Sequence, residues 1–117
     1  MSILENAKSH FANKASGELR KISVTEWKTD VFYKPINSFA VESKVIELTQ
    51  KGKTVEALVE TLILKALDAN GKPLFNKFDK ATLMNEVDPS IITRVVSEIN
   101  SNDLVEYEAV EKNSERT

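Results

Sequence analysis

Cysteine is absent from the 117 residues of this protein, and histidine occurs only once, at position 10. Without cysteine, neither a disulfide nor a thiolate metal site can form. A lone histidine cannot build a histidine-based metal cluster, and we interpret His10 as a helix-surface or partly packed residue. The sequence therefore predicts a protein without a bound metal, without another cofactor and without a histidine-based active site.

Glycine and long apolar runs are also scarce. Gly17, Gly52 and Gly71 lie far apart at expected element boundaries, so no glycine-rich phosphate-binding loop is present. The longest apolar run ends at Lys65, and it is far shorter than the roughly 20 residues that a membrane-spanning helix needs. The first 14 residues lack the apolar stretch of a signal peptide. We expect a soluble cytoplasmic protein that does not contact a membrane.

A basic excess is missing as well. The chain has 16 basic and 18 acidic residues, which gives a net charge of −2. Proteins that bind nucleic acid usually carry a clear positive excess, because neutralisation of phosphates supplies much of their affinity. We therefore expect no nucleic-acid partner.

The composition itself is that of an ordinary globular protein. Hydrophobic residues make up 41% of the chain and charged residues 29%, and this length suits one domain. We predict an α+β fold, with a mainly helical single domain over residues 1–100 that has four to five helices and one β-hairpin in its N-terminal half. Residues 101–117 hold five acidic and two basic residues without hydrophobic periodicity, which predicts an acidic flexible tail.

The first half of the chain should form two helices and the hairpin. Ser2 and Glu5 have the spacing of a capping box, so a helix is expected over residues 2–14. Residues 19–36 are rich in β-branched and aromatic residues, which predicts the hairpin. Asn37 or Ser38 should cap the next helix, which runs to about residue 50 and offers Phe39 to the core.

The second half should be mainly helical, with a short extended link at residues 74–78. Thr54 should cap a central helix over residues 55–69, with a broad apolar stripe that includes Val55 and leaves Lys65 outside it. Asp79 should cap a helix that reaches residue 87. Asp88 and the proline after it should start the last helix, whose apolar stripe is expected in the core.

Three aromatic residues of the predicted hairpin are candidates for a protein interface: Trp27, Phe32 and Tyr33. Aromatic residues are enriched at interface hot spots, because they bury a large area at a low entropic cost. The second strand carries apolar side chains on both faces, and one small domain does not readily cover both. The same residues also suit packing within their own domain, so both interpretations stay open.

The helices predicted at residues 79–87 and 89–100 allow one alternative function, that of a small helical DNA-binding regulatory protein. The last helix, however, offers only Arg94 as a basic contact. The nearby carboxylates Asp79, Glu86 and Asp88 do not indicate paired acid–base catalysis, because Asp79 and Asp88 lie where helix caps are wanted. The sequence contains no convincing active site, and we predict that the protein is not an enzyme.

Two segments together resemble a known family. They are ISVTEWKTDVFYKPI at residues 22–36 and LILKALDANGKPLFNKFDKATLMNEVDPSIITRVVSEI at residues 62–99. Their order and spacing are similar to those of the small tail assembly chaperones of siphophages and related prophages. The resemblance covers about residues 20–100 and depends on the whole pattern, because no single motif in it is diagnostic.

The resemblance implies a non-catalytic role in the cytoplasm of the bacterial host. Such chaperones bind the tape measure protein and keep it soluble, help to recruit tail-tube protein, and are absent from the finished virion. Self-association into a homo-oligomer is expected. The family often makes a longer product by programmed frameshifting, and Glu111-Lys112-Asn113 is a sequence that a slippery codon run could encode.

Overall fold

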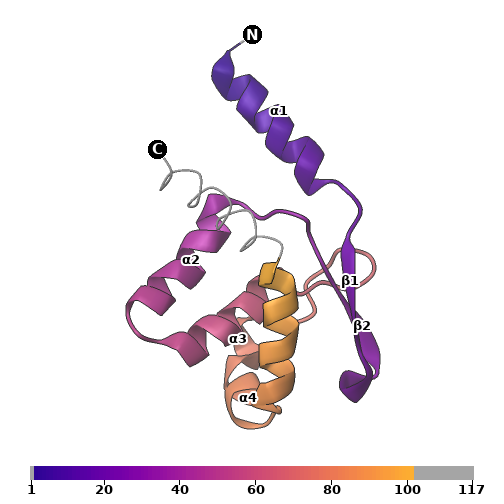
Figure 1. Cartoon of the computed structure of the whole chain (residues 1–117), viewed down its shortest axis with the longest axis vertical. Coiled ribbons are helices and arrows are strands. Elements are labelled where there is room, and N and C mark those ends of the chain that lie inside the picture. The colour runs from indigo at the N-terminus through magenta and orange to yellow at the C-terminus, as the bar shows by residue number, and fades with distance from the viewer. Residues whose placement is uncertain (1, 102–117) are drawn as a thin grey trace, which may run out of the picture.

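The computed structural model describes residues 2–101 of the chain. Within this range the protein contains five α-helices and one two-stranded antiparallel β-hairpin, as the sequence predicted (Figure 1). Apart from Ser101, the tail predicted at residues 101–117 lies outside the described residues. The segment at Glu111-Lys112-Asn113 lies outside them too, and the frameshift stays a prediction that the gene sequence would test.

Helix α1 (Ile3–Ala15) starts where the capping pattern predicts. The Ser2 hydroxyl oxygen accepts a hydrogen bond from the Glu5 backbone N–H at 3.1 Å. None of the side chains of α1 is buried. The helix extends from the start of the hairpin toward one end of the molecule, away from the other helices (Figure 1).

The hairpin consists of β1 (Arg20–Val24) and β2 (Thr29–Tyr33), joined through a short 3-10 turn at Thr25–Trp27. In the register of the pair, Ile22 lies opposite Val31. Alternate residues of both strands are buried, as expected for a sheet with one face on the core. The hairpin therefore uses one face to cover the helices.

Helix α2 (Phe39–Gln50) is capped by Ser38, one of the two predicted caps. It packs against helix α3 (Thr54–Lys65), and both helices are seen beside each other in Figure 1. The prediction that Phe39 faces the core is wrong, because 80% of Phe39 is exposed. Val55 at the start of α3 is also 61% exposed, since α2 covers α3 only along part of its surface.

Helix α3 ends four residues earlier than predicted, and the reason is a contact with the hairpin. Ala66 is extended, and the Leu67 N–H donates to the Phe32 carbonyl at 2.7 Å while the Phe32 N–H donates to the Leu67 carbonyl at 2.9 Å. Leu67 thus lies along the free edge of β2. The sequence did not reveal this pairing, because its partners are far apart in the chain.

Lys65, predicted outside the apolar stripe, is only 2% exposed. Its ammonium donates to a Glu42 carboxylate oxygen at 2.8 Å and lies 3.4 Å from the Asn100 side-chain oxygen. The side-chain exposures in this ion pair are 1% for Lys65 and 16% for Glu42. A buried charge needs such partners, so this contact joins α2, α3 and the last helix.

Two shorter elements complete the helical part. Asn76, not Asp79, provides the capping box ahead of a 3-10 turn at Lys77–Asp79, which leads into α4 (Lys80–Asn85). Asp79 instead accepts a hydrogen bond from the Asn76 backbone N–H at 2.8 Å. The last helix covers residues 89–101, and the Asp88 carboxylate accepts from the Ser90 N–H at 2.9 Å, as a cap should.

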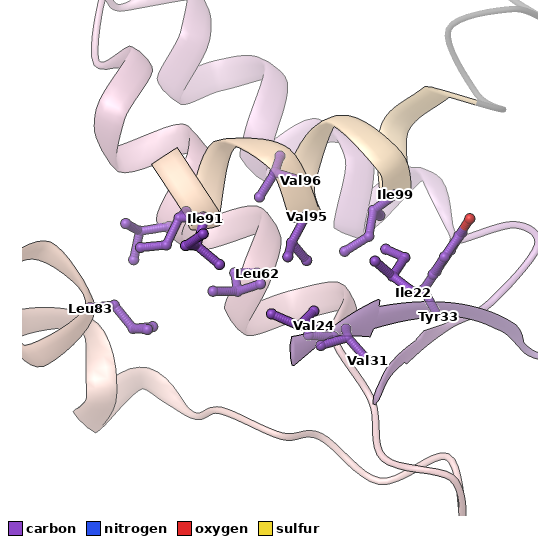
Figure 2. Close-up of a cluster of buried hydrophobic side chains, with 13 residues drawn as sticks. Ile22, Val24, Val31, Tyr33, Leu62, Leu83, Ile91, Val95, Val96 and Ile99 are labelled. Atoms are coloured by element: carbon purple, nitrogen blue, oxygen red, sulfur yellow. The ribbon is translucent and has the colours of Figure 1, made fainter. Parts of the chain in front are cut away.

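The core lies between the hairpin and the helix pair formed by α3 and the last helix. Figure 2 shows the buried residues of both strands facing Leu62 of α3 and the apolar stripe of the last helix. The predicted stripe is confirmed, because every member is at most 8% exposed: Ile91, Ile92, Val95, Val96 and Ile99. No helix within residues 2–101 has the length and apolar character required to span a membrane.

Candidate protein-interaction site

Several large apolar side chains are exposed on the surface within residues 2–101. Helices α1 and α2 each expose such residues, and further ones lie around α3 and α4. The large hydrophobic residues with at least 37% exposure are Ile3, Leu4, Phe11, Phe39, Ile46, Val55, Phe78 and Met84. Exposed apolar groups that cluster, rather than scatter singly, mark surfaces for protein contacts.

The three aromatic candidates have different positions. Tyr33 is 6% exposed and belongs to the core cluster, so its ring offers little surface to a partner. Phe32 is half-buried, and its backbone pairs with Leu67. Trp27 is half-buried against the edge of the core. The structure does not bring the three together as one patch, and Trp27 is the candidate that lies beside a cavity.

This cavity, the Trp27 cavity, has a volume of about 340 Å³. The indole of Trp27 meets the ring of Phe75 edge-on, with ring centroids 6.0 Å apart and an interplanar angle of 79°. Such T-shaped pairs are favourable, because the positive edge of one ring faces the negative face of the other. The lining residues are Trp27, Thr29, Leu74, Phe75, Leu83 and Val87.

A second hollow, the α3–α4 groove, shares Leu83 and Val87 with the Trp27 cavity as lining residues. Its volume is about 160 Å³, and three helical segments contribute to it. The lining residues are Val55, Leu58, Val59, Leu83, Met84, Val87, Pro89, Ile92 and Thr93. Residues of α4 contribute to both hollows, and apolar side chains form most of each lining.

Sequence reasoning missed most of these lining residues. Leu74 and Phe75 were interpreted as part of an extended link, although two adjacent apolar residues in a loop are a signal of packing. Met84 and Val87 lie in and after a helix of only six residues, which is too short for its apolar face to be recognised by periodicity. Trp27 was found because its residue type alone is typical of interfaces.

The tip of the hairpin is tied to the last helix by an ion pair. The Arg94 guanidinium donates to both Glu26 carboxylate oxygens, at 2.8 and 2.9 Å. The hydrogen bond from Arg94 lowers the pKa of Glu26 to about 2. Arg94 is the sole basic residue of the segment 89–101, and the apolar stripe of this helix is buried. This arrangement does not favour the DNA-binding alternative.

We expect the ion pair between Glu26 and Arg94 to make the stability of the folded protein depend on pH in the acid range. The Glu26 pKa of about 2 lies below its ordinary value of 4.5, so the stabilisation is complete above about pH 4.5 and is lost as the pH falls toward 2. The difference in melting temperature between wild type and Glu26→Gln should therefore shrink over this range. Thermal melts of both proteins from pH 6 to pH 2 measure it, and a difference that stays constant would contradict the assignment.

Metal-binding chemistry has no candidate in the described range. Within residues 2–101, no group of three or more histidine, cysteine, aspartate or glutamate side chains could hold a metal ion.

Comparison with known proteins shows one informative likeness. No protein-family model matches the chain, and no curated protein matches it in sequence. Among solved structures, the chain is similar to the tail assembly chaperone of bacteriophage HK97, with a TM-score of 0.60 and 17% sequence identity. The match covers 86% of this chain and 98% of the HK97 protein. The protein therefore has the fold of a bacteriophage tail assembly chaperone, as the resemblance in its sequence predicted.

Proposed function

We propose that this protein is a tail assembly chaperone, which binds the tape measure protein of a long-tailed phage and promotes assembly of the tail tube. The observation that carries the proposal is a match of fold over almost the whole length of a tail assembly chaperone. The protein acts by contact alone, without catalysis and without a cofactor. Its place is the cytoplasm of the bacterial host, before the virion is complete.

The Trp27 cavity is the surface that we assign to the partner. A tape measure protein is long, helical and partly apolar, and before the tube encloses it, its exposed surface promotes aggregation. An amphipathic helix of such a protein can place an apolar side chain in a hydrophobic hollow. The cavity has the required character, because aromatic and aliphatic side chains form most of its lining.

Self-association is part of the proposal. One small cavity makes a weak contact, but many linked copies along one long partner raise the overall affinity without any new type of contact. Copies of this protein would thus cover successive segments of the tape measure protein and present tail-tube protein to it. Neither a nucleic acid nor a membrane is needed as a partner.

Co-expression with the tape measure protein of the same phage or prophage tests this function. Wild type should keep the tape measure protein in the soluble fraction. Thr29→Lys places a charge at the cavity lining, where Thr29 is exposed. We expect capture of the tape measure protein to become about tenfold weaker, because the new ammonium loses water when a partner side chain fills the cavity. A tenfold weaker binding constant corresponds to about 1.4 kcal/mol.

The matched control is Thr25→Lys, which makes the same change at an exposed position of the same hairpin outside the cavity. This variant should capture the tape measure protein as wild type does. Equal loss in both variants would reject the cavity as the contact surface. A wild-type protein that leaves the tape measure protein insoluble would reject the function itself.

A further inference from the structure

The Trp27 cavity has walls from two separate parts of the chain. Trp27 and Thr29 come from the tip of the hairpin, which is the end of the hairpin away from α1 (Figure 1), while the other lining residues come from residues 74–87. The last helix begins directly after that second segment, at residue 89. The shape of the cavity therefore depends on how the hairpin tip is held against the helical part of the protein.

The tip has little packing of its own. The 3-10 turn at Thr25–Trp27 has no side-chain cap and no buried residue. Lys28, which follows the turn, has a left-handed backbone with a φ of 56°, and within residues 2–101 it is the only non-glycine residue with a positive φ. This conformation is unfavourable for a residue with a Cβ atom, and it persists only where the surroundings enforce it. The tip therefore needs contacts outside the hairpin.

The ion pair between Glu26 and Arg94 is such a contact, and Glu26 directly precedes Trp27 in the chain. The guanidinium donates to both carboxylate oxygens, at 2.8 and 2.9 Å. Two parallel hydrogen bonds fix the direction of a contact as well as its length. The side chains of Glu26 and Arg94 are 43% and 46% exposed, and exposed ion pairs add little to overall stability. The main effect of this ion pair is therefore on the position of the tip.

We infer that Glu26 and Arg94 are positioning residues of the capture site. Their ion pair holds the hairpin tip so that the Trp27 indole lies edge-on to Phe75 and forms one wall of the cavity. Neither Glu26 nor Arg94 lines the cavity, so both act through Trp27. The inference rests on the proposed function, since it concerns the surface that we assign to the tape measure protein. When the ion pair is broken, the tip takes other positions and only part of the molecules have a complete cavity.

The expected loss of capture follows from the fraction of molecules whose cavity is formed. If the tip stays in place for about one fifth of the time without the ion pair, apparent affinity falls about fivefold. We expect this result for Glu26→Gln and for Arg94→Gln, which each remove one charge. The concentration of either variant that keeps the tape measure protein soluble on dilution from urea should rise by the same factor. The melting temperature at pH 7 should fall only slightly, because the ion pair is exposed.

Three further variants separate positioning from a general effect of charge. The double variant with Glu26→Gln and Arg94→Gln should capture as weakly as either single variant and no more weakly, because both substitutions remove the same contact. Arg94→Lys should give an intermediate result, since lysine keeps the charge but cannot donate two parallel hydrogen bonds. The matched control is Glu47→Gln, which breaks an exposed ion pair on α2 whose residues do not line the cavity. This control should capture as wild type does.

The fluorescence of Trp27 reports the position of the tip directly, because it is the single tryptophan of the chain. Trp27 is half-buried, and acrylamide should quench it more strongly in folded Glu26→Gln and Arg94→Gln than in wild type or Glu47→Gln. Circular dichroism should show that all variants keep their helices. The measurement needs no partner. A wild-type protein that leaves the tape measure protein insoluble would thus reject the proposed function, while quenching would still test the role of the ion pair.

Three outcomes would overturn the inference. Quenching in both single variants could equal that of wild type, which would show that the ion pair does not position Trp27; weaker capture in that case would indicate direct contact of Glu26 or Arg94 with the partner. Quenching could increase while capture stays unchanged, which would show that the position of Trp27 does not matter for the partner. The two substitutions could have additive effects on capture, which would show that the residues act separately.

Discussion

Replacing Glu42 with alanine should lower the free energy of unfolding by about 3 kcal/mol, because it removes a charged partner of a buried ammonium. Lys65 is almost completely buried, and the Glu42 carboxylate lies 2.8 Å from its Nζ. Asn100 remains within 3.4 Å after the substitution, but its amide oxygen carries no full charge. Loss of this ion pair makes the buried ammonium, and with it the folded state, less favourable. Urea denaturation at pH 7 measures the change.

The same helix offers a matched control. Glu47 forms an ion pair with Lys51 at the same distance of 2.8 Å, but both side chains are exposed, at 64% and 59%. Glu47→Ala should lower the free energy of unfolding far less than Glu42→Ala does, since water screens an exposed ion pair and solvates the lysine that is left. Equal effects of the two substitutions would show that burial of Lys65 does not matter. Replacing both members of the buried pair, as in Glu42→Leu with Lys65→Met, should recover much of the loss.

Leu62→Ala should lower the free energy of unfolding by about 3 kcal/mol or more, because it leaves a cavity at a position that the fold cannot readily close. Leu62 is 0% exposed and lies between the hairpin and the last helix (Figure 2). The protein has one tryptophan, Trp27, which packs against the same core cluster. Its fluorescence therefore reports unfolding of this core directly.

Leu64→Ala is the control for this substitution. Leu64 lies in the same helix and loses the same atoms, but it is half-buried and does not belong to the core cluster. The cost should be no more than about 1 kcal/mol, since less apolar area is returned to water. If Leu64→Ala destabilised the protein as much as Leu62→Ala, the centre of the core would lie elsewhere.

The apolar surfaces around α4 show which parts of a candidate binding site can be predicted from residue type alone. Trp27 could be selected from the sequence, because tryptophan is frequent at interfaces whatever its surroundings. The cavity beside it could not be predicted, since Phe75 and Val87 reach it from parts of the chain that local patterns do not connect. Tyr33 was selected for the same reason as Trp27, because it is aromatic, yet it lies on the inner face of the hairpin. Successive residues of a strand point to opposite faces of the sheet, so the position of a residue along the strand decides which face it joins.

The sequence by itself determined the type and order of the helices and strands, although not every boundary. Caps at Ser2, Ser38 and Asp88 bind backbone groups two or three residues away, so a short stretch of chain contains all the information that they need. The alternation of the hairpin and the apolar stripe of the last helix are local in the same sense. For this reason these elements were predicted correctly.

Only the tertiary structure decided which side chains those elements bury. Lys65 lies in the interior because Glu42 and Asn100 meet it there, while Phe39 remains in solvent at the start of α2. Helix α3 ends at Lys65 because Leu67 pairs with Phe32 of the hairpin. Each of these outcomes depends on residues that are distant in the chain and close in space, and a periodic pattern within one segment carries no information about its partner.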